Sequence, residues 1–180
     1  MRQGLYFFWI LEINTFLVQV RDRLEAPVVV MSYLNPLLAL PNLPGQLAAA
    51  GVEGCIVPDL PLEDADLLGV PLVQLVAPNT PDDRAARLVA ASRGFVYAVT
   101  ACGTTGGAVG ITPEMTRHLR RLRGPTPVLA GFGIRTAAQV ATLAPHCDGV
   151  VVGSALVRTL LDGGDPAATL RGLRPTRSAA

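Results

Sequence analysis

The chain has 180 residues, of which 50% are hydrophobic and 16% are charged, and its formal net charge is +1. This length suits one domain and is sufficient to bury a sizeable core. A nearly neutral chain offers no electrostatic footprint for nucleic acid or for an anionic membrane surface, so we expect neither as a partner. All 15 basic residues are arginine. Because the sequence contains no lysine, Schiff-base chemistry by a lysine of this chain is excluded.

The three cysteines, Cys55, Cys102 and Cys147, are far apart in the sequence and have no CxxC spacing. We therefore expect no disulfide framework and no metal site, and a cytoplasmic location is the natural one for such a chain. Cys55 and Cys147 lie in or beside apolar runs, which predicts that they are buried packing residues. Cys102 stands next to Gly103 in a predicted loop.

The first 24 residues differ in character from the rest of the chain. The apolar run Leu5–Leu11 is too short to span a bilayer and no small-residue cleavage site follows it, so we predict neither a membrane span nor a signal peptide. Residues 1–24 are predicted to be an atypical N-terminal helical segment, because apolar side chains recur at helical spacing at Ile10, Ile13, Leu17, Val20 and Leu24. The aromatic cluster before them is either a cover over exposed core or sequence outside the native fold.

Beyond Pro27, apolar β-branched runs alternate with polar or alanine-rich segments of helical character. This alternation indicates βαβ units and a parallel sheet. Strands are expected to begin near Val28, Gly54, Leu72, Phe95, Pro127 and Gly149. Helices are expected over Leu43–Ala50, Leu62–Leu68, Pro81–Ser92, Pro113–Arg123, Thr136–Leu143 and Ala155–Leu161. Residues 25–165 would form the folded part, and residues 166–180 a flexible C-terminal tail.

Two glycine-containing units mark the last two predicted strands, VLAGFG at 128–133 and GVVVGS at 149–154. Each apolar run ends in glycine just before a helix-like segment. Glycine lets backbone N–H groups approach an anion, and the helix N-terminus adds a favourable dipole. In an eight-stranded β/α barrel, the loops after strands seven and eight often form a phosphate site. The two units therefore predict a site for a phosphorylated small molecule, although the glycines could instead serve only tight βα turns.

Six predicted strands cannot close the usual barrel of eight. We therefore interpret the fold as an α/β protein, a TIM-type (β/α)8 barrel that lacks roughly its first two βα units. An open doubly wound sheet is the structural competitor. That fold places its glycine-rich phosphate loop after the first strand, whereas the glycines here gather at the last three strands, which favours the barrel.

Several motifs, in matching order and spacing, resemble the tryptophan synthase alpha subunit family. The segment at 27–36, PVVVMSYLNP, resembles the family's third-strand signature. The segments PDLPLE at 58–63 and LVAPNT at 75–80 resemble its fourth-strand and fifth-strand loops. FVY at 95–97, followed by GTTG at 103–106, resembles the sixth strand and the mobile loop after it. The GFG and GSA motifs complete a resemblance that runs from about Glu25 to Leu161.

The resemblance implies a lyase of tryptophan biosynthesis that cleaves indole-3-glycerol phosphate to indole and glyceraldehyde 3-phosphate. It implies no cofactor, and a beta subunit as partner in an α2β2 heterotetramer. Carried over by position, the phosphate-binding residues would be Gly106, Gly131, Gly133, Gly153 and Ser154. The substrate pocket would be lined by Tyr97, Thr105, Phe132, Met31, Ile56 and Val151, of which the apolar members could instead be plain barrel core. The residues that face the partner would be Tyr33, Asn35, Asp59 and Pro61.

The family's chemistry also needs two carboxylates, a glutamate at the end of the second strand and an aspartate in the loop after it. General acid–base catalysis requires such groups within hydrogen-bond reach of the reacting atoms. No segment here resembles the ELGIPFSDP-like motif that carries them, so no catalytic residue is assigned and the 180-residue polypeptide is expected to be inactive in cleavage.

Three interpretations stay open. The first is a true alpha subunit whose start lies further upstream. The second is a non-catalytic binder of phosphate ligands, or a partner that activates the beta subunit. The third is an unrelated phosphosugar-binding barrel fragment.

Overall fold

The structure is a computed structural model that describes residues 25–100, 111–131 and 133–174. The chain divides into two compact units. The first comprises Met1–Gln74 with Ala91–Arg93, and the second comprises Leu75–Ala90 with Gly94–Ala180. The helix predicted within residues 1–24 lies outside the described residues.

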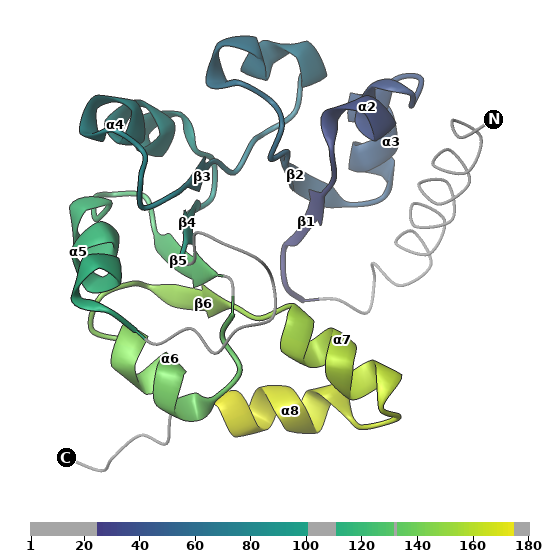
Figure 1. The fold of residues 1–180 in the computed structure, drawn as a ribbon. Helices are drawn as coiled ribbons and strands as arrows, with labels where there is room; N and C mark the ends of the chain where they lie inside the picture. Colours follow the sequence, from purple (N-terminus) through teal and green to yellow (C-terminus); the bar gives the residue numbers. More distant parts are fainter. Residues whose placement is uncertain (1–24, 101–110, 132, 175–180) are drawn as a thin grey trace. The chain divides into compact units, whose positions relative to one another are not determined.

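The first unit is built on two parallel strands, β1 (Val28–Met31) and β2 (Val52–Ile56). The helices α2 (Leu34–Leu38) and α3 (Leu43–Ala49) connect them, and the 3-10 helix η2 (Leu62–Leu68) follows β2 (Figure 1). Apolar side chains from these elements and the segments between them form one buried cluster, which consists of Leu37, Leu40, Leu43, Leu47, Cys55, Val57, Leu68 and Leu72. The predicted helix over 43–50 is confirmed, and α2 is an addition that the sequence did not indicate.

The break between α2 and α3 has a local cause. Asn42 adopts a left-handed conformation with a φ of 50°, and Pro44 stands in the first turn of α3. A left-handed residue interrupts the helical backbone, whereas proline is tolerated only in the first turn of a helix. The chain therefore starts a new helix at Leu43 rather than extending α2.

The second unit contains four parallel strands that lie side by side in chain order. These are β3 (Leu75–Val76), β4 (Val96–Val99), β5 (Val128–Gly131) and β6 (Gly149–Val151). Helices connect the strands and follow the last one (Figure 1), namely α4 (Asp82–Ala91), α5 (Pro113–Arg121), α6 (Ala137–Leu143) and α7 (Ser154–Leu161). A doubly wound sheet reverses its strand order at a switch point, whereas a β/α barrel keeps the chain order. The strand order of this unit is therefore that of the barrel.

Side-chain caps fix where two of these helices begin. The Thr112 hydroxyl accepts a hydrogen bond from the Met115 amide at 3.3 Å, with Pro113 in the first turn of α5. Thr136 and Gln139 form a capping box at the start of α6, in which each side chain accepts from the backbone of the other residue. Such caps satisfy amides that have no intrahelical acceptor, and they set the ends of the loops that follow β4 and β5.

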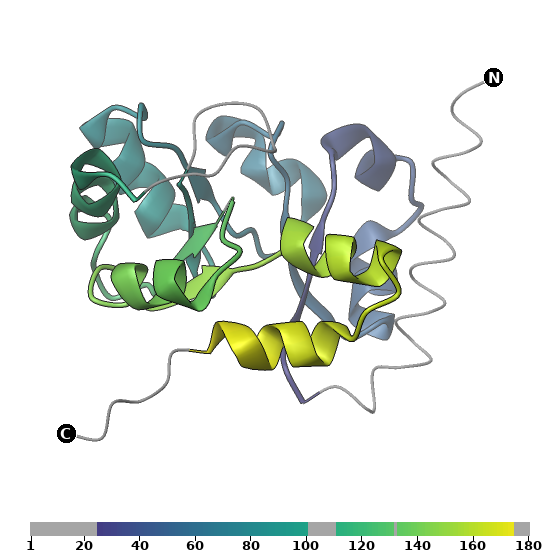
Figure 2. The same cartoon turned by 60° about the horizontal axis from the view of Figure 1, so that its bottom comes forward.

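The sequence predicts a flexible tail from residue 166, but this is corrected by a helix, α8, over Pro166–Leu173. The Asp165 carboxylate caps it by accepting from the Ala167 amide at 2.8 Å. Figures 1 and 2 show α7 and α8 side by side, where the Thr159 and Thr169 hydroxyls are 3.0 Å apart. The tail prediction missed this contact because packing between the two helices cannot be inferred from the composition of the tail. Residues 175–180 lie outside the described part.

Within the described part of the chain, no helix combines the length and apolar character needed to cross a membrane.

Candidate functional site

The predicted phosphate-binding glycines of the last two strands lie at one edge of the sheet. Gly131 ends β5 and is paired in register with Val151 of β6. Gly133 follows in the loop with a φ of 81°, a conformation that side-chain-bearing residues rarely adopt. Gly153 directly precedes α7, whose first residue is Ser154. The structure therefore brings these four residues to the carboxyl ends of neighbouring strands, and Gly106 lies outside the described residues.

The turn between β6 and α7 leaves space in front of a helix N-terminus. Gly153 caps α7 without a side-chain hydrogen bond, and its carbonyl accepts from the amides of Leu156 and Val157. Gly153 and Ser154 are both exposed. Apart from residue 153 and its two chain neighbours, no heavy atom lies within 4 Å of the place where a Cβ of residue 153 would stand. Because the first amides of a helix lack intrahelical acceptors and carry the positive end of the dipole, this turn offers donors to an anion.

Gly131 has a packing role that the sequence analysis did not identify. A Cβ at this position would overlap the ring of Tyr97, which is buried on β4. The Gly131 carbonyl also accepts from both the amide and the hydroxyl of Thr100. Glycine is therefore required here by the neighbouring strand, whatever the ligand. Burial raises the pKa of Tyr97, so its hydroxyl keeps its proton.

The other predicted pocket residues are divided between the two units. Met31 and Ile56 are register partners at the carboxyl ends of β1 and β2 in the first unit, where Ile56 is buried and Met31 is exposed. Val151 is half-buried at the end of β6 in the second unit. Thr105 and Phe132 lie outside the described residues. Plain core packing accounts for Ile56 but not for the exposed Met31.

The residues predicted to face a partner all belong to the first unit. They come from two short segments of the chain, one before and within α2 and one after β2. Tyr33, just before α2, is 66% exposed. Asn35 and Pro61 are also exposed. Asp59, after β2, accepts a hydrogen bond from the Leu34 amide at 2.8 Å through Oδ1. This bond satisfies an amide at the start of α2 and ties together two loops that the sequence analysis treated separately.

The cysteines that the structure describes, Cys55 and Cys147, are buried as the sequence predicts. Burial raises the pKa of the Cys55 thiol to about 11, so at neutral pH this side chain is not a thiolate nucleophile. Cys102 lies outside the described residues. Among the residues that are described, no group of three or more His, Cys, Asp and Glu side chains is placed to hold a metal ion.

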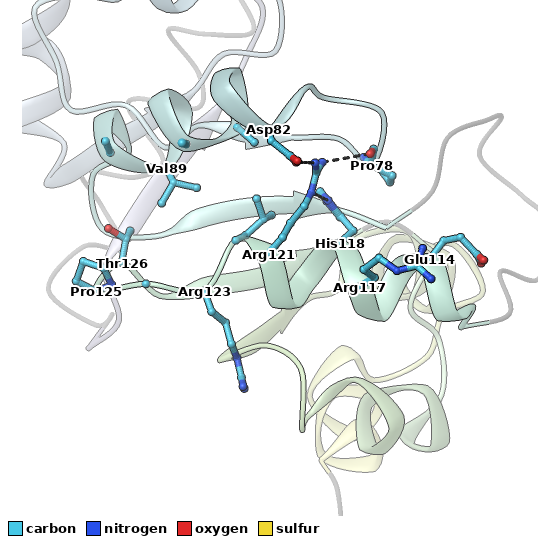
Figure 3. Close-up of a pocket in the computed structure, with 15 residues that line it drawn as sticks. Pro78, Asp82, Val89, Glu114, Arg117, His118, Arg121, Arg123, Pro125 and Thr126 are labelled. Atoms are coloured by element: carbon cyan, nitrogen blue, oxygen red, sulfur yellow. Dashed lines mark hydrogen bonds and ion pairs between the residues drawn. The ribbon is translucent and has the colours of Figure 1, made fainter.

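A pocket of about 890 Å³ lies between α4 and α5 in the second unit (Figure 3). One wall is formed on α4 by the apolar side chains of Ala85, Ala86, Val89 and Ala90. The other wall is rich in arginine and contains the buried His118. None of the predicted phosphate-site or substrate-pocket residues that the structure describes lines this pocket, and nothing in the sequence pattern indicated it.

Known proteins resemble this chain over most of its length. The sequence profile of the family described as tryptophan synthase alpha chain matches residues 9–171. The tryptophan synthase alpha chain of Streptomyces coelicolor is 41% identical over 169 residues, and that of Bacillus thuringiensis subsp. konkukian is 39% identical over 155 residues. These matches cover 86% and 80% of this chain but 62% and 60% of those proteins. The chain thus spans about three fifths of the length of these relatives.

Solved structures of tryptophan synthase share the fold. A chain from the α2β2 complex of Pyrococcus furiosus aligns with a TM-score of 0.78 and 34% identity, covering 90% of this chain and 70% of that one. A chain from the ligand-free Mycobacterium tuberculosis enzyme gives a TM-score of 0.75 at 32% identity and covers 91% and 65%. The predicted β/α-barrel fold class and the predicted resemblance are both confirmed. On the strength of the profile match and these relatives, the chain belongs to the tryptophan synthase alpha chain family.

Proposed function

We propose that this chain contains the phosphate-ligand-binding part of a tryptophan synthase alpha chain. The whole protein would cleave indole-3-glycerol phosphate to indole and glyceraldehyde 3-phosphate, in the cytoplasm and without a cofactor. The observation that carries the proposal is the open turn between β6 and α7, where Gly153 and Ser154 present a helix N-terminus to empty space. Gly133, at the carboxyl end of the neighbouring strand, belongs to the same edge.

Backbone amides suit a phosphate ester, because several N–H groups can share a spread negative charge without a lysine. The Ser154 hydroxyl would add one more donor at the positive end of α7. Tyr97, packed against Gly131 beside this edge, would form part of the wall for the flat indole. Val151 at the end of β6, together with Thr105 and Phe132, would complete that pocket, and Gly106 would complete the phosphate site.

We assign binding and orientation to these residues rather than proton transfer. The sequence contains no counterpart of the glutamate and aspartate that the family's cleavage chemistry needs. General acid–base groups contribute about 10²- to 10⁴-fold to a rate, so a polypeptide without them would retain ligand affinity but not efficient cleavage.

A second candidate function is the activation of a beta subunit. The α2β2 complex of P. furiosus is described as one of mutual activation. In this chain the exposed Tyr33, Asn35 and Pro61 would form the docking surface, with Asp59 fixing the start of α2 through its bond to the Leu34 amide. This function would not require the carboxylates of the cleavage chemistry.

The substitution Gly153→Val tests the phosphate site. We expect it to weaken the binding of glycerol 3-phosphate about 10- to 100-fold, the size of one lost charge-assisted hydrogen bond, because the side chain would fill the space in front of the amides. Thermal stability should change little, since the new Cβ meets no atom within 4 Å beyond its own chain neighbours and the backbone there is not left-handed. Isothermal titration calorimetry on both proteins measures the affinities.

The matched control is Gly124→Val, which adds the same side chain where a Cβ also meets nothing within 4 Å. Gly124 precedes β5 and so lies toward the opposite end of that strand, and its substitution should leave the affinity unchanged. Gly133→Val is a less clean test, because the φ of 81° strains any side chain there. Equal affinities in the wild-type protein and Gly153→Val would contradict the proposal.

A further inference from the structure

His118 is a buried histidine for which the proposed binding function has no use. It lies on α5 and is only 3% exposed. Its Nε2 is 3.1 Å from the carbonyl oxygen of Val76, and its Nδ1 is 3.3 Å from Nε of Arg121. A carbonyl only accepts and a guanidinium only donates, so Nε2 must carry the proton and Nδ1 must accept. The contacts therefore require the neutral ring in one tautomer.

Arg121 extends this contact from α5 to the loop that follows β3. Its Nη2 donates to the carbonyl oxygens of Thr80 at 2.9 Å and Pro78 at 3.2 Å. Its Nη1 is paired with Asp82 at the start of α4, and Figure 3 shows the guanidinium reaching toward Asp82 and Pro78. Because Asp82 is exposed, the ion pair contributes little to stability. The hydrogen bonds to the two carbonyl oxygens are therefore the main link between Arg121 and the loop.

The loop also has its own internal hydrogen bonds. The Ala77 amide donates to the Thr80 hydroxyl at 3.1 Å, and the Thr80 amide donates to the Ala77 carbonyl at 3.0 Å. This loop leaves β3 at the carboxyl end, which is the edge of the parallel sheet that also carries Gly131. The strand it leaves pairs with β4, where Leu75 is in register with Tyr97. The contacts that Arg121 of α5 makes with this loop therefore influence the end of the sheet where the ligand is proposed to bind.

We propose that His118 and Arg121 are positioning residues that fasten loop 77–80 at the ligand edge, and that a proton on His118 releases it. A protonated ring has an N–H at Nδ1, so Arg121 would lose its acceptor there and would face a second cation. The carbonyl contacts of Arg121 would then no longer be braced by the ring. The consequence for ligand affinity rests on the proposed function, whereas the release of the loop does not.

The surroundings of His118 favour its neutral form. Burial is the main cause that lowers its pKa below the usual 6.5, the charge of Arg121 acts in the same direction, and the Val76 carbonyl opposes both. The neighbouring strands β3 and β4 contribute no charged side chain. The charged groups that line the pocket beside His118 are Asp82, Glu114, Arg117, Arg121 and Arg123. The contacts of His118 and Arg121 with loop 77–80 are therefore fully formed above about pH 6.5. They are lost as the pH falls through the lowered pKa of His118 in the folded state.

Nitrogen shifts of the imidazole and hydrogen exchange of the loop amides, both measured by NMR on the full chain, test the proposal. At about pH 7.5 we expect a neutral His118 with its proton on Nε2. When the pH is lowered from about 7.5 until the nitrogen shifts show a protonated His118, protection of the Thr80 amide, corrected for intrinsic exchange, should fall about tenfold, as for one lost charge-assisted hydrogen bond. A proton on Nδ1, or protection that is independent of pH, would overturn the proposal.

Variants distinguish the clamp, meaning the contacts of His118 and Arg121 with loop 77–80, from a general sensitivity of the protein to acid. His118→Gln keeps a side-chain donor for the Val76 carbonyl but cannot titrate, so its Thr80 protection should not change with pH. Arg117→Gln, on the exposed side of α5 directly before His118, should keep the wild-type profile. A wild-type pH dependence in His118→Gln would overturn the proposal. If that variant does not fold, the nitrogen shifts and Thr80 protection of the wild-type protein decide the question.

The affinity for glycerol 3-phosphate provides the link to function. The ratio of wild-type to His118→Gln affinity should fall about tenfold over the same pH range, while titration of the ligand's own phosphate cancels in the ratio. A ratio that does not change would overturn the positioning role. Absence of phosphate binding in every protein would instead contradict the proposed function, and the tautomer and exchange measurements would still decide whether the clamp exists.

Discussion

Gly131→Ala is expected to lower the free energy of unfolding by about 1–3 kcal/mol, the usual cost of overpacking a well-filled site. The new Cβ would overlap the buried Tyr97 ring, and β5 is held on its other side by pairing with β6. Either the ring or the strand must move, so we also expect weaker phosphate binding. Urea denaturation of the wild-type and variant proteins measures the change in stability.

A double-mutant cycle with Tyr97→Ala identifies the cause of that destabilisation. Removing the ring leaves room for the alanine, so the cost of Gly131→Ala should be much smaller in the Tyr97→Ala background. Gly124→Ala is the control, because a Cβ at Gly124 meets nothing within 4 Å. Additive effects of the two substitutions would show that the overlap with the ring is not the reason for glycine at position 131.

Leu119→Ala is expected to cost about 2–5 kcal/mol of unfolding free energy, the range for truncating a large buried aliphatic side chain. Leu119 is 0% exposed on the inner face of α5, the helix that also carries His118 and Arg121. Alanine keeps the helix propensity, so the change isolates the lost packing. Chemical denaturation of the full chain provides the measurement.

The control for Leu119→Ala is Leu161→Ala at the end of α7, where the side chain is 76% exposed. A surface truncation away from special features changes stability by about 0.5 kcal/mol or less. Equal effects of the two substitutions would contradict the placement of Leu119 in the core of the second unit.

Local patterns in the sequence predicted most helix positions. They could not determine which residues of the apolar run after Pro71 pair with which neighbouring strand. A single strand was expected to begin near Leu72. In the structure, Leu72 forms a parallel bridge with Cys55, and the Val73 amide donates to the Cys55 carbonyl at 2.9 Å. Only Leu75–Val76 form β3, which pairs with β4. Hydrophobicity signals that a segment is buried, but the choice of neighbouring strand depends on the whole fold.

In the candidate site too, local features could be predicted from the sequence, whereas contacts between distant segments could not. Glycines that follow strands, such as Gly133 and Gly153, could be identified from the sequence because their place between a strand and a helix is a local property. The contacts between Tyr97 and Gly131, between Asp59 and Leu34, and between His118 and Val76 could not. Each joins segments that are distant in the chain, by 25 residues for Asp59 and 42 for His118, and depends on strand register or helix docking.

The central claim is that a phosphate ligand binds at the carboxyl ends of β5 and β6. Amide chemical shifts recorded during a titration of the full chain with glycerol 3-phosphate test this claim residue by residue. The account predicts that the largest shifts fall on Gly133, Gly153 and Ser154. The arginine-rich pocket between α4 and α5 is the competing place for an anion, so the largest shifts at Arg117, Arg121 and Arg123, or no shifts at saturating ligand, would contradict it.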